Sequence, residues 1–336
     1  MKKELKRYAR PLLGLIISSL LLWQLFAHID LEKLRTTLWA AKAWPIALGL
    51  CAVAAGFALR ALRWHAMVAH FTPSVRLPAT ATAFLSSFAL NNTLPLRAGD
   101  LARTFMYAKE LQTSPATLAA TLLIERLLDA ATLVLLFCLG LWWIPAEKIP
   151  AAWMGWVQQL GAIFTAAALA GLVALFLLPK MVMWALRYFE HTSKGAKLKA
   201  VVVQFGAAFG LLRSPALVLK LLALSLLSWA LEGCVFLAVA HALGMVLPGY
   251  APWFALSTAT LATLIPGTPG HLGTFDYFAV LGFSLYGINR TDGASMALLI
   301  HLLLWLPVTV VGGVLLLRRQ GTGTLEKIHQ LEKEHT

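Results

Sequence analysis

The sequence predicts an all-α integral membrane protein with about six full spans and two re-entrant broken-helix hairpins, arranged as an inverted repeat. The 336 residues are 59% hydrophobic and only 13% charged, and the mean hydropathy is +0.75, whereas soluble domains carry about 25% charged residues. Simple hydropathy separates eight hydrophobic segments. Proline and glycine interrupt two of them at matching places in the two halves of the chain.

The net charge and the cysteine positions limit which partners and metal sites we expect. The net charge is +13. In a chain this apolar, we expect the basic residues to set membrane topology and to contact anionic lipid headgroups, not nucleic acid. Cys51, Cys138 and Cys234 lie far apart in apolar runs, which is typical of packing residues and predicts no metal site. The sequence has no H-E-x-x-H motif and no nucleotide-binding glycine loop, so we expect no cofactor and no enzyme activity.

The first two spans follow a basic N-terminal tail. Residues 11–27 are apolar, and no A-x-A-like cleavage site follows them, so we expect an uncleaved span and not a signal peptide. Residues 28–44 read as a loop of mixed charge. The second span is predicted over residues 45–64, with Arg60 and Arg63 in its last turn.

The first interrupted segment covers residues 79–94. It is apolar but short for a span, and Pro95 follows it directly. Proline removes a backbone donor, so a helix that reaches this point breaks. An amphipathic piece, RAGDLARTFMYAKE, continues from Arg97.

The next predicted helix runs over residues 115–143 and contains the motif ERLLD. Glu125 and Asp129 share one helix face, and Arg126 can reach Asp129 three residues on. Ionisable side chains inside an apolar span are costly, so we expect Arg126 to pair with Asp129 or with a carboxylate of the facing repeat. Two interpretations stay open: a structural ion-pair clamp, and a charge relay or headgroup site.

The remaining elements are a span over about residues 156–178 and a strongly basic connector over residues 180–213, followed by two further spans and a tail. Residues 180–220, which include this connector, have seven basic residues against one acidic residue, which favours a helix lying on the lipid headgroups. The later elements are a span over residues 216–243 with Glu232 inside it, a final span over residues 294–317 and a charged tail over residues 318–336.

The second interrupted segment, LATLIPGTPGHLGTFD, covers residues 261–276 and combines two prolines, three glycines and three threonines with a histidine and an aspartate. A broken backbone at membrane depth is tolerated only where protein packs around it or where it lines a water-filled cavity. One interpretation is an ordinary interhelical turn at the surface. The other, which we favour, is a re-entrant hairpin whose broken tip forms a polar site.

The distribution of basic residues predicts the topology. If residues 79–94 and 253–288 each return to their starting side, only five of the 28 basic residues face outward, and both termini lie in the cytoplasm. If residues 79–94 crossed fully, the basic connector would lie outside. The positive-inside rule therefore favours re-entry, with the chain in a bacterial inner membrane.

This topology divides the chain into two similar halves of opposite orientation, residues 45–143 and residues 216–317. Each reads as a span, a broken hairpin and a span. Aligned on the prolines of the breaks, Glu232 falls opposite Arg60–Arg63, and in the same alignment His301 falls opposite Asp129. Paired interruptions in inverted halves are typical of the substrate site of a secondary transporter.

Two sets of candidate functional residues follow from the breaks and the charged spans. An arginine can hold a phosphate bidentately, and a broken helix end supplies free N–H groups beside it. The substrate-binding candidates are Arg97, Asp100, Arg103, Thr268, Gly270 and Thr274. The candidates for a charge relay or ion pairs are Glu125, Arg126, Asp129, Glu232 and Asp276.

Several of these residues have alternative interpretations. Arg103 is equally compatible with an arginine at the membrane interface. Asp100, Glu125 and Asp276 could hold the empty site's arginine or carry protons that couple movement to a gradient. For His271 we expect a turn residue, and for His301 a packing residue inside an apolar span.

The motifs PLRAGDLAR, ERLLD and PGTPGHLGTFD resemble those of the membrane, or flippase, domain of bacterial lysylphosphatidylglycerol synthases. The resemblance covers about residues 10–318. Glutamate is usual in that family where this chain has Asp100 and Asp276, and glycine where it has His271. The resemblance implies lipid translocation. It does not imply synthesis of a lysyl-lipid, because it does not extend to the cytosolic aminoacyl-transferase domain of the two-domain members. Some stand-alone members are associated with hopanoid or polyprenyl-lipid pathways, which implies lipid-biosynthesis enzymes as partners.

Two classes of function therefore remain. In the first, an amphiphile with an anionic headgroup passes through a polar groove between the repeats while its tails stay in the bilayer. In the second, the chain is a membrane-embedded enzyme or an accessory or scaffolding subunit of lipid or lipid-linked glycan synthesis.

Overall fold

The computed structural model describes residues 2–27, 29–144 and 206–334, with scattered positions between residues 155 and 204. Within these residues every regular element is a helix. The α-helices are α1 (Lys2–Phe26), α2 (Leu31–Trp39), α3 (Ala43–Phe71), α4 (Leu77–Thr93), α5 (Ala98–Phe105), α6 (Pro115–Trp143), α9 (Pro215–Ala242), α10 (Ala251–Ala262), α11 (Thr274–Leu285) and α12 (Arg290–Glu334). Short 3₁₀ turns are η1 (Pro95–Arg97), η3 (Phe209–Arg213) and η4 (Pro269–His271).

Three of the described helices are long and apolar enough to cross a membrane. They are α3, α9 and residues 290–319 of α12, with mean hydropathies of 1.8, 2.0 and 2.3. A fourth span results if residues 12–26 of α1 and helix α2 count as one span bent by 89°. A multi-pass membrane protein is therefore confirmed. The six full spans stay a prediction, and the expected span at 156–178 and the basic connector lie largely outside the described residues.

Helix α3 is longer than the sequence predicted. It continues to Phe71, so Arg60 and Arg63 lie in its interior and not in its last turn. The expectation was wrong because both arginines have carboxylate partners inside the protein, Glu232 and Asp129. A paired arginine does not need to reach the membrane interface for solvation.

The predicted loop of residues 28–44 also contains structure, because α2 forms within it. Asp30 precedes this helix, and its carboxylate accepts a hydrogen bond from the Lys33 amide at 2.9 Å. Such a cap satisfies one of the free donors at a helix N-terminus. At the other end of the chain, α12 extends through most of the predicted charged tail.

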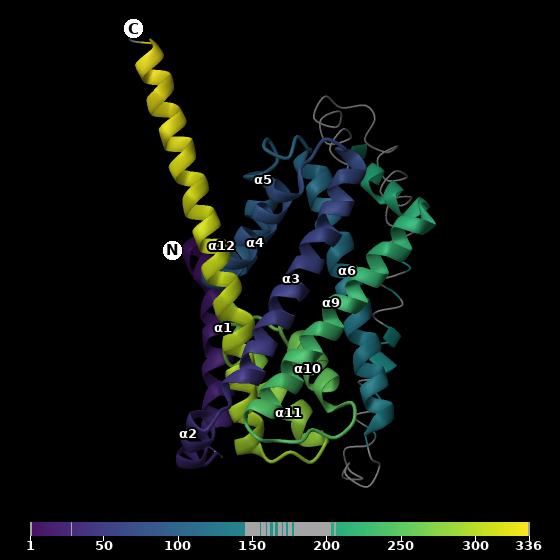
Figure 1. Ribbon diagram of the computed structural model, residues 1–336, viewed down its shortest axis with the longest axis vertical. Coiled ribbons are helices and arrows are strands. Elements are labelled where there is room, and N and C mark those ends of the chain that lie inside the picture. Colours follow the sequence, from purple (N-terminus) through teal and green to yellow (C-terminus); the bar gives the residue numbers. More distant parts are fainter. Residues whose placement is uncertain are drawn as a thin grey trace.

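The two broken segments lie toward opposite ends of the molecule. Figure 1 shows α4 and α5 in the upper half and α10 and α11 in the lower half, with α3 and α9 crossing between them. Helix α3 packs along α9, α4 packs against α12, and α10 packs against α6. Elements of the first half of the chain thus pack on elements of the second half.

The first break forms a tight helical hairpin. After α4 the chain turns at Leu94 and η1, and α5 returns along α4. Gly99 permits this return, since a Cβ there would collide with the Ser87 carbonyl. Asn91 joins the two arms, because its side chain donates to the Asp100 carboxylate at 2.9 Å and accepts from the Asp100 amide at 3.2 Å.

The second break forms a similar hairpin from α10 and α11. The Thr258 hydroxyl of α10 donates to the Phe278 carbonyl of α11 at 3.1 Å. Between the arms the backbone takes left-handed conformations at Gly270 (φ +69°), His271 (φ +59°) and Gly273 (φ +85°). Glycine adopts such conformations at little cost. Both interrupted segments are helix–break–helix hairpins, and their re-entry into a bilayer stays a prediction.

The hydrophobic core has two parts that meet at charged residues. One cluster is centred on α9, α10 and α11, and the other on α3, α4 and α6. Along α3 the boundary falls between Val53 and Ala61, at Arg60, and along α6 it falls between Leu128 and Leu133, at Asp129. A layer of charged side chains therefore separates the two apolar halves.

Candidate functional site

The charged layer consists of ion pairs between helices. A charge in an apolar span costs at least about 2.5–3.5 kcal/mol on insertion scales, so such groups are expected to pair. The pairs are Arg60–Glu232, Arg63–Asp129, Arg103–Glu125, Arg126–Asp100 and His301–Asp276.

Asp129 is the centre of a junction between α3, α6 and α9. The two oxygens of its carboxylate accept hydrogen bonds from the Arg63 guanidinium at 2.6 and 3.1 Å. The Trp229 indole also donates to this carboxylate, at 3.0 Å. Beside it, Arg60 pairs with Glu232 and lies 4.5 Å from the centroid of the Trp229 ring.

Arg103 and Glu125 form the most deeply buried pair. Both side chains are 1% exposed, and the guanidinium donates to the two carboxylate oxygens at 3.1 and 3.4 Å. The Arg103 guanidinium also lies 4.8 Å from the Trp64 ring centroid and 5.2 Å from that of Phe84. This arrangement clamps α5 to α6.

The expected pairing of Arg126 is wrong. Its guanidinium donates to both oxygens of Asp100 at 3.0 and 3.2 Å, and so joins α6 to α5. Asp129 lies three residues further along α6, but Arg63 of α3 occupies it. A helix-surface pairing was expected from the spacing, and tertiary partners replace it.

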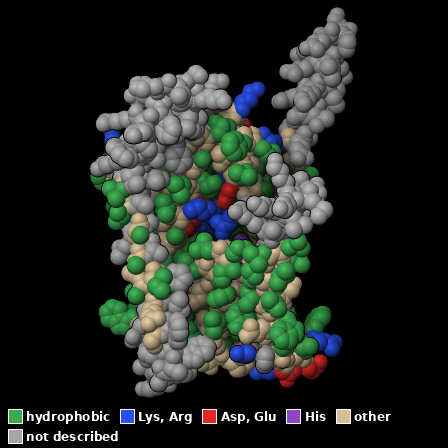
Figure 2. Space-filling model, turned by 180° about the vertical axis from the view of Figure 1, so that it is seen from behind, with side chains coloured by type: hydrophobic (Ala, Val, Ile, Leu, Met, Phe, Trp, Pro, Cys, Tyr) green, Lys and Arg blue, Asp and Glu red, His purple; other side chains and the backbone are tan. Residues whose placement is uncertain are grey.

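Two neighbouring cavities lie against the charged layer. The outer cavity has a volume of about 470 Å³ and lies between the two breaks. The inner cavity has a volume of about 210 Å³ and is lined by charged residues of α3, α6, α9 and α12. Both cavities are lined by Asn91, Arg97, Thr263 and His271. Figure 2 shows basic and acidic side chains gathered in a recess halfway along the molecule, with hydrophobic side chains above and below.

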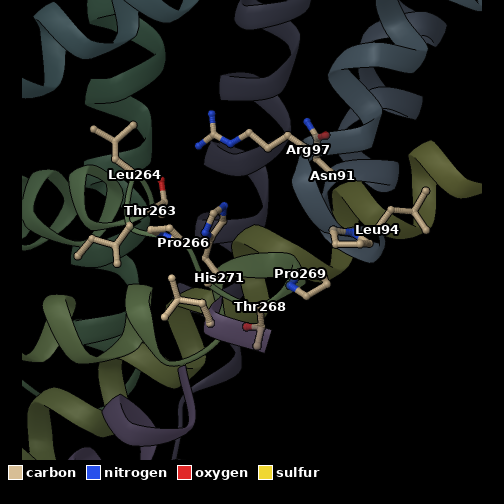
Figure 3. A pocket seen from close by; sticks show the side chains of 13 residues that line it. Asn91, Leu94, Arg97, Thr263, Leu264, Pro266, Thr268, Pro269 and His271 are labelled. Atoms are coloured by element: carbon tan, nitrogen blue, oxygen red, sulfur yellow. The ribbon is translucent and has the colours of Figure 1, made fainter. Parts of the chain in front are cut away.

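Arg97 differs from the other arginines of the charged layer. Each of the others faces a carboxylate, whereas Arg97 has no hydrogen bond or ion pair with any residue that the structure describes. Figure 3 shows its side chain extending from the first break across the outer cavity, above His271. Its backbone is left-handed (φ +53°, ψ +44°), which costs a non-glycine residue on the order of 1–3 kcal/mol. Among the described residues, the fold therefore holds Arg97 as a cation without a partner, in a strained backbone conformation at the cavity.

The other predicted substrate-binding residues differ in whether they line a cavity. Thr268 lines the outer cavity and Gly270 the inner one. The Thr268 amide donates to the Ser18 hydroxyl of α1 at 3.1 Å. Thr274 is fully buried and donates its hydroxyl to the His271 carbonyl at 3.0 Å. Arg103 and Thr274 are outside the lining of both cavities.

His301 is buried, as expected of a packing residue, and both of its ring nitrogens contact groups of the second break. Its Nδ1 lies 2.8 Å from the Asp276 carboxylate, and its Nε2 lies 2.9 Å from the Gly270 carbonyl. The other carboxylate oxygen of Asp276 accepts from the Gly273 amide at 2.9 Å. The sequence feature that could have identified His301 as a site residue is its position as an ionisable residue inside an apolar span. Arg60 and Arg63 show the same feature.

Comparisons with known proteins agree with this architecture. The family model described as the lysylphosphatidylglycerol synthase TM region matches residues 12–312. Two similar proteins are UPF0104 membrane proteins of Methanocaldococcus jannaschii. MJ1078 is 22% identical over 226 residues, which cover 67% of this chain and 92% of the relative. MJ1595 is 22% identical over 324 residues, which cover 90% of this chain and 93% of the relative.

Proposed function

The chain belongs to the family of the lysylphosphatidylglycerol synthase TM region, and on that premise we propose that it moves an amphiphile with an anionic headgroup across the membrane. The family assignment agrees with the resemblance of the sequence motifs. One observation carries the proposal further: Arg97 lies in a cavity between two broken helices and has no ion-pair partner in the part of the chain that the structure describes.

The headgroup binds at Arg97 in this proposal. A guanidinium can hold a phosphate through two parallel hydrogen bonds. The other arginines of the charged layer are neutralised by carboxylates, so Arg97 leaves the cavity with an uncompensated positive charge. Asn91, Thr263 and Thr268 line the same space and supply neutral polar groups.

The tails of the amphiphile bind beside this site. An apolar cavity of about 390 Å³ lies between α6, α10 and α11, with Phe137, Phe254 and Phe278 in its wall. Leu264 and Ile265 line both this cavity and the outer polar cavity. A molecule with a charged head and apolar tails can therefore contact both cavities at once. A free ion would leave the apolar cavity unused, and a neutral lipid would leave the charge of Arg97 unused.

The predicted inverted repeat provides the transport cycle. In support, α4 of the first half packs on α12, and α10 of the second half packs on α6, so corresponding elements make corresponding contacts. We propose that the two breaks are re-entrant tips among six full spans and meet near the midplane. Both termini then lie in the cytoplasm, in the inner membrane of a bacterium, and movement of one half against the other exposes Arg97 to each side in turn. Transport, not catalysis, is the role proposed.

Reconstitution into liposomes tests this function. The purified protein is incorporated into vesicles that contain a trace of fluorescent phosphatidylglycerol, and an impermeant quencher reports how much probe reaches the outer leaflet. We expect faster movement than in protein-free vesicles, and a smaller increase for a phosphatidylcholine probe with the same tails. Polyprenyl-phosphate and hopanoid probes define the class of tail. A protein-containing vesicle that moves no probe faster than an empty one contradicts the proposal and favours an enzymatic or accessory role.

A further inference from the structure

We propose that the Asp276–His301 pair is a proton-binding site, and that a proton bound there travels with each anionic headgroup. This inference rests on the proposed lipid movement and names the ion that drives it. The pair lies on α11 and α12. His301 lines the inner cavity, which shares Arg97 with the outer one.

Hydrogen-bond accounting shows that the pair holds an extra proton. The Nε2 of His301 faces the Gly270 carbonyl at 2.9 Å, and a carbonyl can only accept, so Nε2 carries a hydrogen. The Nδ1 faces a carboxylate oxygen of Asp276 at 2.8 Å. That contact needs a hydrogen as well, carried either by Nδ1 or by the carboxyl group. In both cases the pair has one proton more than a neutral histidine beside an ionised aspartate.

Loss of this proton must break a contact at the tip of the second break. The equation is His301-H⁺·Asp276⁻ → His301·Asp276⁻ + H⁺, and one hydrogen then remains for two acceptors. Either the Gly270 carbonyl or the Asp276 carboxylate then faces a nitrogen lone pair. Gly270 is left-handed (φ +69°), and a Cβ built on it would lie 2.6 Å from Nε1 of Trp305. The tip at Gly270 is therefore packed closely against Trp305.

The surrounding charges link this proton to the headgroup. Besides His301, six ionisable side chains line the inner cavity. Four of them belong to ion pairs: Arg60 and Glu232 pair with each other, Arg126 pairs with Asp100, and Asp129 pairs with Arg63. The other two are Arg97, which has no partner among the described residues, and His271. The paired groups are neutralised, so Arg97 supplies the net positive field of the inner cavity, which His301 also lines. An anion bound to Arg97 cancels that field. The anion and the proton therefore favour each other's binding, and this coupling is reciprocal.

The pair is accessible enough to exchange its proton. The His301 side chain is 10% exposed, at the cavity wall, while the Asp276 side chain behind it is 1% exposed. A water molecule in the inner cavity can reach the imidazole and not the carboxylate. The imidazole thus forms the entry to a buried carboxylate, an arrangement suited to storing a proton during transport.

The test measures the distribution of fluorescent phosphatidylglycerol between the leaflets of liposomes under an imposed pH difference. The membrane potential is held at zero with equal potassium on both sides and an ionophore. If one proton moves with each lipid, a pH difference of about one unit shifts the distribution about tenfold toward the alkaline leaflet. The wild type and the His241→Gln variant should both show this shift, since His241 is an exposed histidine at the end of α9.

Variants that cannot hold the proton should lose the shift. In the Asp276→Asn/His301→Gln double variant, the glutamine amide can still donate to the Gly270 carbonyl and accept from the asparagine, so the tip keeps its contacts without a titratable group. We expect this variant to distribute the probe equally at every pH difference, and Asp276→Glu to retain the shift.

The result separates this inference from the proposed function. A wild type that moves the probe but leaves it evenly distributed, or concentrates it in the acidic leaflet, overturns the proton site and leaves lipid movement standing. A double variant that keeps the tenfold shift overturns it as well. A wild type that moves no probe overturns both.

Discussion

Removal of Glu125 alone should destabilise the protein strongly, whereas removal of both members of its pair should not. Glu125 and Arg103 are each 1% exposed and joined by two hydrogen bonds. Breaking a buried pair leaves an uncompensated charge and costs about 3–5 kcal/mol, while replacing both members with apolar residues of similar volume is close to neutral. We therefore expect about 3–5 kcal/mol of lost unfolding free energy for Glu125→Leu, and about 1 kcal/mol or less for Arg103→Met/Glu125→Leu.

The measurement is reversible unfolding in mixed detergent micelles, followed by tryptophan fluorescence. Trp64 lies 4.8 Å from the Arg103 guanidinium and reports on this region. A full double-mutant cycle, including Arg103→Met, should give a coupling energy of at least about 3 kcal/mol, at the upper end for contacting residues. A loss below about 1 kcal/mol for Glu125→Leu refutes the clamp.

The same double variant decides between two roles of Arg103. The sequence made it a candidate for binding the headgroup, but the structure places it outside both cavities. A folded double variant that moves lipid at the wild-type rate supports the structural role. A folded but inactive one would return Arg103 to the binding site.

Three further predictions concern the two breaks. The free energy of unfolding of Arg97→Gly should exceed that of Arg97→Ala by about 1–2 kcal/mol, because glycine adopts the left-handed backbone conformation without strain. Equal free energies of unfolding would contradict the strain. Gly99→Ala should lower the yield of folded protein on size-exclusion chromatography, since its Cβ meets the Ser87 carbonyl where α5 returns along α4; a normal profile would exclude this close approach. Gly270→Ala should cost about 1–3 kcal/mol in the same unfolding assay, because it adds a Cβ against Trp305 at a positive φ, and an unchanged midpoint would contradict that packing.

Local sequence signals predicted several helices and both breaks, but not helix α2 or the partners of the charged residues. Helix α6 begins at Pro115, after the cap of Ser114, and ends at Trp143, as expected. Proline and glycine marked both breaks, because their backbone preferences act within a few residues. Asp129 instead pairs with an arginine 66 positions away in the sequence, which depends on how α3 packs against α6.

The length of α3 shows the same limit. Arg60 resembled the end of a span, because a charged residue in an apolar helix usually lies at the interface. The helix continues because Glu232, on another helix, neutralises the charge inside the protein. For the candidate site, too, the sequence predicted a residue but not its pairing. Arg97 was identified from the break beside it. That it has no partner among the described residues depends on how the other arginines of the layer pair.

The central claim is that Arg97 holds the headgroup, and the rate of lipid movement in Arg97→Ala tests it most directly. The control is Arg76→Ala, which removes the same charge from an exposed position at the start of α4. Loss of a charge-assisted contact worth about 1.5–3 kcal/mol lowers affinity roughly 10- to 100-fold. We predict at least a tenfold slower movement of fluorescent phosphatidylglycerol for Arg97→Ala, an intermediate rate for Arg97→Lys, which lacks the planar fork, and the wild-type rate for Arg76→Ala. A monodisperse Arg97→Ala protein that moves the probe at the wild-type rate would contradict the account.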